Sequence, residues 1–321
     1  MSKFTVMVAD DRYGSYLEEE AILNEIGATL EVRNLSSEEE ALRVLPRADG
    51  IFVNLFPLNK RVIESLARCR VISRYGVGYD NVDVEAATWK RIWVARVPDY
   101  CFEDVSDHAL GLLLGCVRKI AYKDRLVREG KWNLTKAQPC HRIAGRTLGL
   151  VGFGAIAHCL LRKVSGFGLA RVLAYDPYVD PAETGKAGAI AVDLATLARE
   201  SDYISVHAPL SPETKGLIGE KEIGMMKLTA IIINTSRGPV VDEEALAAAL
   251  REGRIAAAGL DVFAVEPLPP RSPLRELDNV ILSDHTGWYS EESVGELKTK
   301  AARNIALVLT GGKPLYPVNA V

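Results

Sequence analysis

Residues 148–164 read LGLVGFGAIAHCLLRKV, which is an apolar run, a glycine-rich turn and then an amphipathic helical pattern. The turn has the form G-x-G-x-x-A, in which Gly152 permits a tight turn and Gly154 lets the backbone approach a phosphate closely. Ala157 stands where the packing of helix on strand needs a small residue. Backbone N–H groups at the start of the helix would face the same phosphates. The stretch therefore predicts a strand–turn–helix unit that binds a dinucleotide.

A second feature of dinucleotide sites follows at the expected distance. Nineteen residues after Ala157 (157 to 176), the apolar run RVLAY ends in Asp176, whose carboxylate can accept hydrogen bonds from the adenosine ribose hydroxyls. Pro177 and Tyr178 come next, so no arginine is in position for a 2′-phosphate. We therefore expect NAD rather than NADP. The alternative is a plain strand–helix–strand unit that ends in a surface aspartate.

Apolar runs alternate with helical patterns along nearly the whole chain, which indicates an α/β fold with parallel sheets. We expect two Rossmann-like domains with doubly wound parallel sheets and a cleft between them. Residues 1–99 plus 287–321 are predicted to form a flavodoxin-like substrate-binding domain, and residues 100–286 an NAD-binding Rossmann domain. The strands are expected at residues 4–8, 30–33, 50–55, 71–74 and 93–97, and then at 148–152, 172–175, 203–206, 230–234, 257–260 and 280–282.

Two helical patterns bear on the assembly. Residues 102–130 predict a single long helix, about twice the average length in globular proteins. Its apolar middle suits packing between domains or subunits, so we expect a homodimer. Residues 290–312 begin with a serine and end in Gly-Gly, which predicts a C-terminal helix.

The composition excludes several classes of protein. The chain has 321 residues, 48% of them hydrophobic and 25% charged, and its net charge of −3 favours binding to neither nucleic acid nor membranes. No apolar run approaches the roughly 20 residues that cross a bilayer. The first ten residues look like a strand rather than a signal peptide, so we expect a cytoplasmic protein. The five cysteines are scattered, and Cys140-His141 has no further ligands nearby in the sequence, so no metal site is expected.

Polar side chains at two other strand ends have the chemistry to reduce a carbonyl group. Arg237, in NTSRG, has a planar guanidinium that can hold a carboxylate or a carbonyl oxygen. His285, in ILSDHTGWYS, has an unperturbed pKa of about 6.5 and can give or take a proton near neutral pH. A surface ion pair and a hydrogen-bonded core histidine are the structural alternatives. His108 and His158 lie in helical patterns and are interpreted as structural.

Several blocks resemble the signatures of the D-isomer-specific 2-hydroxyacid dehydrogenases. They are SRYGVGYDNVD, SDYISVHAPLSPETKGLI, MMKLTAIIINTSRGPVVDEEALAAALREGRIAAAGLDVFAVEP and SDHTGWYS. The resemblance spans about residues 50–310, and VPDYCFEDVSDHA and HTGWYSEES look closest to the C-terminal-binding-protein branch. It implies an NAD-dependent oxidoreductase that interconverts a 2-keto acid and a D-2-hydroxy acid by hydride transfer.

The resemblance also implies roles for individual residues. Glu266 would be the partner of His285, which acts as general acid or base, while Arg237 binds and polarises the substrate. The formate dehydrogenases of the same superfamily have glutamine at the position of Glu266. Val77 and Gly78 would bind the substrate carboxylate, and Trp288 would line the substrate pocket. The implied cofactor contacts are Val77, Gly152, Gly154, Ala155, Ile156, Asp176, His207, Ala208, Pro209, Thr214, Thr235, Ser236, Arg237, Asp261, His285 and Gly287.

Some questions stay open at this level. Trp288 and Tyr289 fit an aromatic wall for an apolar or sulfur-containing substrate, and they fit plain interdomain packing equally well. Asp284 stands where relatives usually have proline; it either raises the pKa of His285 or, as we prefer, points away as a solvated charge. Ala155 replaces an arginine or polar residue, so one pyrophosphate contact is expected to be missing.

Two other functions compete with the dehydrogenase. The first is an NAD(H)-sensing binding module of the corepressor type with little turnover. The second is a dehydrogenase for phosphite or another oxyanion. The sequence does not identify the 2-hydroxy acid.

Overall fold

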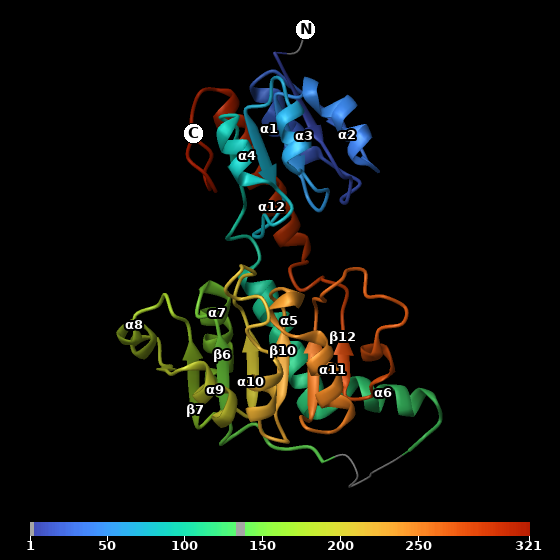
Figure 1. Cartoon of the computed structure of the whole chain (residues 1–321), viewed down its shortest axis with the longest axis vertical. Coiled ribbons are helices and arrows are strands. Elements are labelled where there is room, and N and C mark those ends of the chain that lie inside the picture. The colour runs from blue at the N-terminus through green and yellow to red at the C-terminus, as the bar shows by residue number, and fades with distance from the viewer. Residues whose placement is uncertain (1–2, 133–138) are drawn as a thin grey trace. The chain divides into compact units, whose positions relative to one another are not determined.

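The computed structural model describes residues 3–132 and 139–321, and the chain divides into two compact units. Unit 1 combines Met1–Cys101 with Ser290–Val321, and unit 2 is Phe102–Tyr289. Each boundary lies within three residues of the domain limit expected from the sequence (101 against 99, 289 against 286). Figure 1 shows a parallel sheet with helices around it in each unit.

Unit 1 is built on a five-stranded parallel sheet with the order β2-β1-β3-β4-β5. This is the strand order of flavodoxin-like sheets, and the assignment of this unit to substrate binding stays a prediction. Seven of the eight residues of β3 and β4 are buried, on both faces of the sheet, as a sheet covered by helices requires. The strands are β1 (Phe4–Val8), β2 (Ala28–Val32), β3 (Gly50–Val53), β4 (Val71–Arg74) and β5 (Trp93–Ala95).

Four of the five α-helices described in unit 1 begin at a residue whose side chain caps them. Ser37, Asn59, Asp83 and Ser290 each accept a backbone N–H with the side chain, which satisfies a group that the first helical turn leaves unpaired. The predicted C-terminal helix is present as α12, which packs on α1 and β4. The helices are α1 (Leu17–Glu25), α2 (Glu38–Val44), α3 (Lys60–Ser65), α4 (Val84–Trp89) and α12 (Glu291–Leu309).

Unit 2 contains a seven-stranded parallel sheet with the order β12-β11-β10-β9-β6-β7-β8. The order reverses between β6 and β9, and ligands of open α/β sheets bind outside the carboxyl ends of the strands at such a point. The strands are β6 (Thr147–Val151), β7 (Arg171–Tyr175), β8 (Ile190–Ala191), β9 (Tyr203–Val206), β10 (Ile231–Asn234), β11 (Ala257–Leu260) and β12 (Val280–Leu282).

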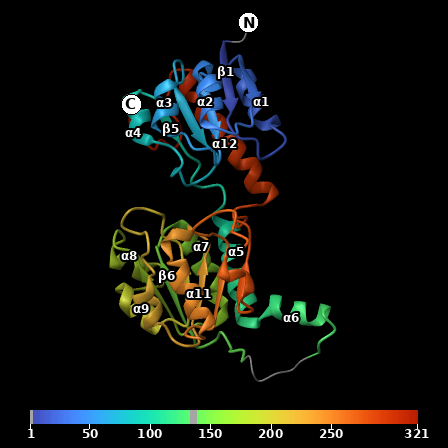
Figure 2. The same ribbon diagram turned by 45° about the vertical axis from the view of Figure 1, so that its right-hand side comes forward.

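Two helical layers cover the sheet of unit 2. Ile231 and Ile233 pack in the cluster that contains residues of α5 and α7, whereas Ile232 packs in the cluster with residues of α9 and α11. Alternate residues of β10 thus face opposite layers. Figure 2 shows α6 standing away from this sheet. The helices are α5 (Phe102–Arg118), α6 (Ile120–Arg128), α7 (Ala155–Val164), α8 (Pro181–Lys186), α9 (Leu194–Glu200), α10 (Glu220–Met225) and α11 (Glu243–Arg251).

The single long helix predicted over residues 102–130 is wrong. Lys119 adopts a left-handed backbone conformation (φ 57°), which ends α5 and lets α6 start in a new direction. Much of the apolar middle of α5 is buried, and α5 packs on β10 and β11 of its own unit. The two-residue edge strand β8, whose side chains are exposed, was not predicted from the sequence.

None of the helices in residues 3–132 and 139–321 combines the length and the apolar character that crossing a membrane requires.

Candidate active site

The predicted residues of unit 2 gather where the strands of one sheet end. Gly152 follows β6, Asp176 follows β7, His207 follows β9, Thr235 follows β10, and Asp261 follows β11. Because all seven strands are parallel, their carboxyl ends share one edge of the sheet. His285 comes three residues after the end of β12, at the same edge.

The glycine turn has the geometry of a phosphate-binding loop. Gly152 has a φ of +86°, and a Cβ there would lie 2.6 Å from the backbone nitrogen of Ala208, so only glycine fits. A Cβ on Gly154 would meet nothing within 4 Å, and Gly154 and Ala155 are exposed. No side chain caps the start of α7, so the N–H groups of its first turn remain for an anion. The turn therefore fits a pyrophosphate.

Asp176 lies beside this turn. Its Oδ2 accepts the backbone N–H of Phe153 at 2.9 Å, and its Oδ1 accepts that of Tyr178 at 3.0 Å. The carboxylate thus fixes the end of β7 against the glycine turn, which is the position from which it would reach a ribose.

The turn after β10 is organised by Asn234, a residue that the sequence analysis missed. Its buried side chain accepts from the backbone N–H of Ser236 at 3.0 Å and from its hydroxyl at 2.9 Å, and donates to the Arg237 carbonyl at 3.0 Å. Within the described part of the chain, the buried Oγ1 of Thr235 has no hydrogen-bond partner. Leaving such a hydroxyl unpaired is costly, so it fits a ligand that supplies the partner.

Gly238 brings the arginine turn against the loop that carries Glu266. A Cβ on Gly238 would lie 1.9 Å from the carbonyl carbon of Phe263, so no other residue fits there. The Nη1 of Arg237 donates to the Ser236 carbonyl at 2.8 Å, which aims the guanidinium. Its charge is one of the groups that lower the pKa of Glu266.

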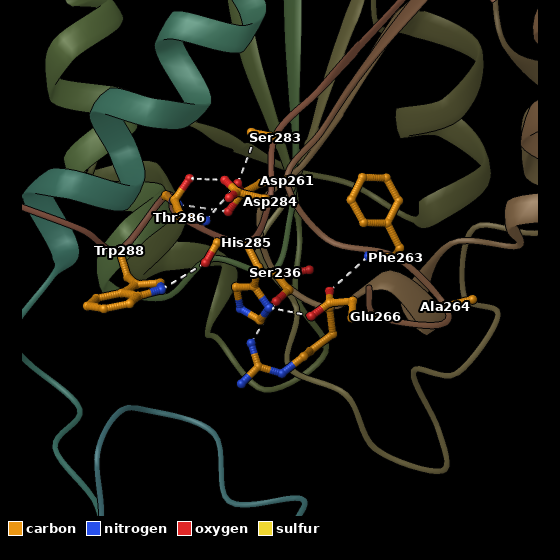
Figure 3. A network of polar contacts seen from close by, with 12 residues as sticks. Ser236, Asp261, Phe263, Ala264, Glu266, Ser283, Asp284, His285, Thr286 and Trp288 are labelled. Atoms are coloured by element: carbon orange, nitrogen blue, oxygen red, sulfur yellow. Dashed lines mark hydrogen bonds and ion pairs between the residues drawn. The ribbon is translucent and has the colours of Figure 1, made fainter. Parts of the chain in front are cut away.

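His285 and Glu266, which are 19 residues apart in sequence, form a direct pair (Figure 3). The Nδ1 of His285 lies 2.7 Å from the Oε2 of Glu266, and the Oε1 of Glu266 accepts the Phe263 N–H at 3.0 Å. Burial raises the pKa of Glu266, but the hydrogen bond and charge of His285, the Phe263 N–H and the charge of Arg237 outweigh it and leave that pKa lowered. The carboxylate thus engages Nδ1 rather than Nε2 of the imidazole.

The loop that carries His285 is strained and firmly held. His285 has a φ of +58°, a conformation that few residues other than glycine adopt. Its N–H donates to the Asp261 carbonyl at 2.9 Å, and the indole nitrogen of Trp288 donates to its carbonyl at 2.8 Å. Trp288 also makes an edge contact with Tyr289 at 5.8 Å between ring centroids. Trp288 therefore holds the loop, and its predicted place in a substrate pocket stays a prediction.

Two acids near His285 behave differently. Asp261 is buried, and both of its carboxylate oxygens accept hydrogen bonds from the chain, so its predicted contact with the nicotinamide amide stays a prediction. Asp284 is exposed and accepts from the Thr286 hydroxyl at 2.9 Å, which agrees with our preference for a carboxylate turned away from the imidazole.

The remaining predicted residues fall into two groups. In unit 2, burial lowers the pKa of His207 to about 4, so this histidine is neutral at pH 7, and its Nε2 pairs with the Ser205 hydroxyl at 2.9 Å. The Thr214 hydroxyl donates to the Pro209 carbonyl at 2.6 Å and closes the loop after β9. Ala208 is buried, Ile156 is partly exposed in the first turn of α7, and Ser236 and Gly287 belong to the two loops described above.

In unit 1, Val77 and Gly78 follow β4 in a turn that begins at Gly76 (φ +134°). Arg96 donates to the Val77 carbonyl at 3.4 Å. The proposed carboxylate contact of this turn stays a prediction. Among residues 3–132 and 139–321, no group of three or more histidine, cysteine, aspartate or glutamate side chains is arranged to hold a metal ion.

Comparison with known proteins agrees with this geometry. Residues 110–287 match the family model of the D-isomer specific 2-hydroxyacid dehydrogenase NAD binding domain. The chain belongs to this family. It is 41% identical to a glyoxylate reductase from Korarchaeum cryptofilum over 266 residues, 82% of this chain and 80% of the relative. It is 38% identical to a D-3-phosphoglycerate dehydrogenase from Methanocaldococcus jannaschii over 92% of this chain, but only 56% of that relative.

A solved structure supports the same assignment. D-lactate dehydrogenase from Aquifex aeolicus, complexed with NAD and lactic acid, aligns with a TM-score of 0.85 and 26% identity over 95% of this chain and 96% of its own. The predictions of an α/β dehydrogenase, of NAD as cofactor and of 2-keto and D-2-hydroxy acids as the reacting pair are thereby confirmed. The comparisons do not favour the NAD(H)-sensing alternative, and membership of the C-terminal-binding-protein branch stays a prediction.

Proposed function

We propose that this chain interconverts a 2-keto acid and its D-2-hydroxy acid with His285 as the proton-transferring group, Glu266 as its partner and Arg237 as the substrate-binding cation. The observation that supports this most is the 2.7 Å contact between the His285 Nδ1 and Glu266. A carboxylate at this distance stabilises the imidazolium form and fixes the ring.

Each residue has a separate task in the reduction. NADH, when bound, supplies the hydride. Negative charge then develops on the carbonyl oxygen, and His285 donates a proton to it from Nε2 while Glu266 stabilises the imidazolium. Arg237 holds the substrate carboxylate or the carbonyl oxygen with its fixed positive charge. In the reverse direction His285 accepts the proton from the hydroxyl group.

The cofactor would be held by the elements whose fit is described above. They are the glycine turn at Gly152 and Gly154 for the pyrophosphate, Asp176 for the adenosine ribose, and Thr235 for the nicotinamide side. In unit 1, the N–H groups of Val77 and Gly78 would bind the substrate carboxylate. Trp288 would give the substrate pocket an aromatic wall.

We also propose a cytoplasmic homodimer. Exposed apolar side chains on α6, rather than the apolar middle of α5, support the dimer. Ile120 and Val127 on α6 are 57% and 55% exposed, which leaves apolar side chains that a second copy could cover.

The test is NADH consumption at 340 nm with a panel of 2-keto acids that includes glyoxylate, pyruvate and longer apolar and sulfur-containing members. We expect turnover with at least one, and a fall in kcat of about 100-fold or more in His285→Ala and Arg237→Ala. The exposed pair His141 and Arg142 supplies matched controls, and H141A and R142A should keep normal rates. Normal turnover in H285A or R237A would refute the role of that residue.

A further inference from the structure

Asp261 holds the histidine loop through several donors at once. Its side chain is 2% exposed, and its Oδ1 accepts from the Ser283 hydroxyl at 2.7 Å and from the Thr286 N–H at 3.1 Å. Its Oδ2 accepts the Gly287 N–H at 2.9 Å. These residues surround His285 in sequence, so one carboxylate fixes the backbone immediately after the catalytic imidazole.

His108, on α5, completes this cluster from the other side. Its Nε2 lies 2.8 Å from the Ser283 hydroxyl and 3.3 Å from the Oδ1 of Asp261. Its ring packs on Gly287, where a Cβ would come within 3.3 Å of the ring and 2.8 Å of Asp261. A histidine interpreted from the sequence as structural therefore contacts the acid that anchors the loop.

The strain at His285 gives this anchoring a consequence. A left-handed conformation at a residue other than glycine costs on the order of 1–3 kcal/mol and persists only where the surroundings enforce it. The N–H groups of Thr286 and Gly287 donate to Asp261, and these two hydrogen bonds hold the backbone that follows His285 in place. A weaker hold on these two amides would let the loop relax and move the His285 ring from its bond with Glu266.

We propose that His108 is a positioning residue, which keeps the Asp261 carboxylate ionised and aligned so that the His285 loop is held in its strained conformation. His108 touches none of the reacting groups that we assign, and acts through Ser283 and Asp261. The effect on turnover rests on the proposed function, whereas the effect on the loop does not.

The arrangement makes the hold on the loop depend on pH. The negative charges of Asp261 and Asp284 both act on His108. The hydrogen bond that His108 donates to Asp261 raises the pKa of His108, against the lowering effect of burial, and the charges of both acids add to the rise. A histidine whose pKa is higher in the folded than in the unfolded state stabilises the folded state. This stabilisation is fully present below the unfolded-state pKa of about 6.5, and it is lost as pH rises through the folded-state pKa.

The experiment measures amide hydrogen exchange at Thr286 and Gly287 by NMR in His108→Leu and His108→Gln. In H108L we expect the protection of both amides to fall about tenfold, with the amides of β10 unchanged, because the opening is local. In H108Q the side-chain amide still donates, so protection should remain. Wild-type protection should decrease as pH rises through the His108 midpoint, and this step should be absent from H108Q. His141→Leu, at an exposed histidine, is the control and should show wild-type exchange.

Kinetics provide the second readout. We expect kcat to fall about tenfold in H108L with less than about a twofold change in KM for NADH, and H108Q to restore kcat. If H108L does not fold, Ser283→Ala removes the hydroxyl that lies between His108 and Asp261, and it should lower the protection of both amides. Unchanged protection in H108L or S283A, or a wild-type pH step in H108Q, would overturn the proposal. Wild-type protein without turnover on any keto acid would count against the proposed function, yet the exchange result would still decide the role of His108.

Discussion

The two units each bury an acid, and the surroundings shift the pKa values of the two acids in opposite directions. Asp261 in unit 2 is 2% exposed, and Glu19 in unit 1 is fully buried. Burial raises the pKa of Asp261, but the hydrogen bonds from His108, Ser283 and the Gly287 N–H outweigh it and bring the pKa to about 2. The pKa of Glu19 is raised, because burial outweighs the hydrogen bond from Tyr75 and the more distant charge of Lys298.

The difference lies in the number of donors. The Oε1 of Glu19 accepts from the Tyr75 hydroxyl at 2.7 Å, but within the described residues its Oε2 has no hydrogen-bond donor. The ammonium of Lys298 is 3.6 Å from that oxygen and is bound to Glu18 instead. Burial alone thus favours the neutral acid, and only several convergent donors keep a buried carboxylate charged.

The largest effect should follow from turning Asp261 into its amide. Asp261→Asn removes the charge that His108 faces and places an NH₂ group against one of the loop donors. We expect the free energy of unfolding of unit 2 to fall by about 3 kcal/mol, since the donors around this buried carboxylate lose their charged acceptor. Exchange of the most protected amides of β10 measures this free energy for unit 2 alone.

Asp284→Asn is the matched control, because Asp284 is an exposed acid in the same loop. It should change the unfolding free energy by less than about 0.5 kcal/mol. A D261N protein as stable as D284N would show that the donors around Asp261 do not depend on its charge.

Replacing the buried acid of unit 1 by its amide should lower the free energy of unfolding by a smaller amount. Glu19→Gln keeps an acceptor for the Tyr75 hydroxyl, and the position already favours a neutral side chain. We expect a loss of no more than about 1 kcal/mol in the unfolding free energy of unit 1, read from exchange of the buried amides of β3 and β4. Glu20→Gln, at the exposed neighbour, controls for the change on the helix surface. A loss in E19Q as large as in D261N would remove the contrast between the two acids.

Much of the fold could be predicted from the sequence because buried parallel strands appear as apolar runs. Five strands, including Tyr203–Val206 and Ala257–Leu260, have the predicted bounds, and most others differ by one or two residues. The exceptions had no such signal. Lys119 ends the helix through a left-handed backbone conformation, which the local sequence pattern does not predict. The strand β8 is too short and too exposed to show a hydrophobic periodicity.

The residues of the candidate site also fall into those that the sequence predicts and those that it does not. The glycine turn, Asp176, Arg237 and His285 could be found because their chemistry is unusual at a strand end. Asn234 had a weaker signal of this kind, a polar residue that closes a run of isoleucines. The role of His108 could not be found, because the contact joins α5 to a residue 153 positions later (108 to 261) and depends on packing at Gly287.

The smallest expected effect is a difference in the pH dependence of the two units. The proton on Glu19 is held more tightly in the folded chain than its ordinary pKa of 4.5 implies, so the folded state binds more protons and its stability falls as pH rises above 4.5. The lowered pKa of Asp261 has the opposite effect. Its stabilisation of the folded state is present above the ordinary pKa of 3.8 and is lost as pH falls towards about 2. Amide exchange between pH 5 and 7 should therefore show a decline for unit 1 that is absent from E19Q, whereas D261N should leave that decline intact. Parallel curves for wild type and E19Q would mean that Glu19 is ionised in both states, and that one hydrogen bond and a distant ammonium are sufficient to keep a buried carboxylate charged.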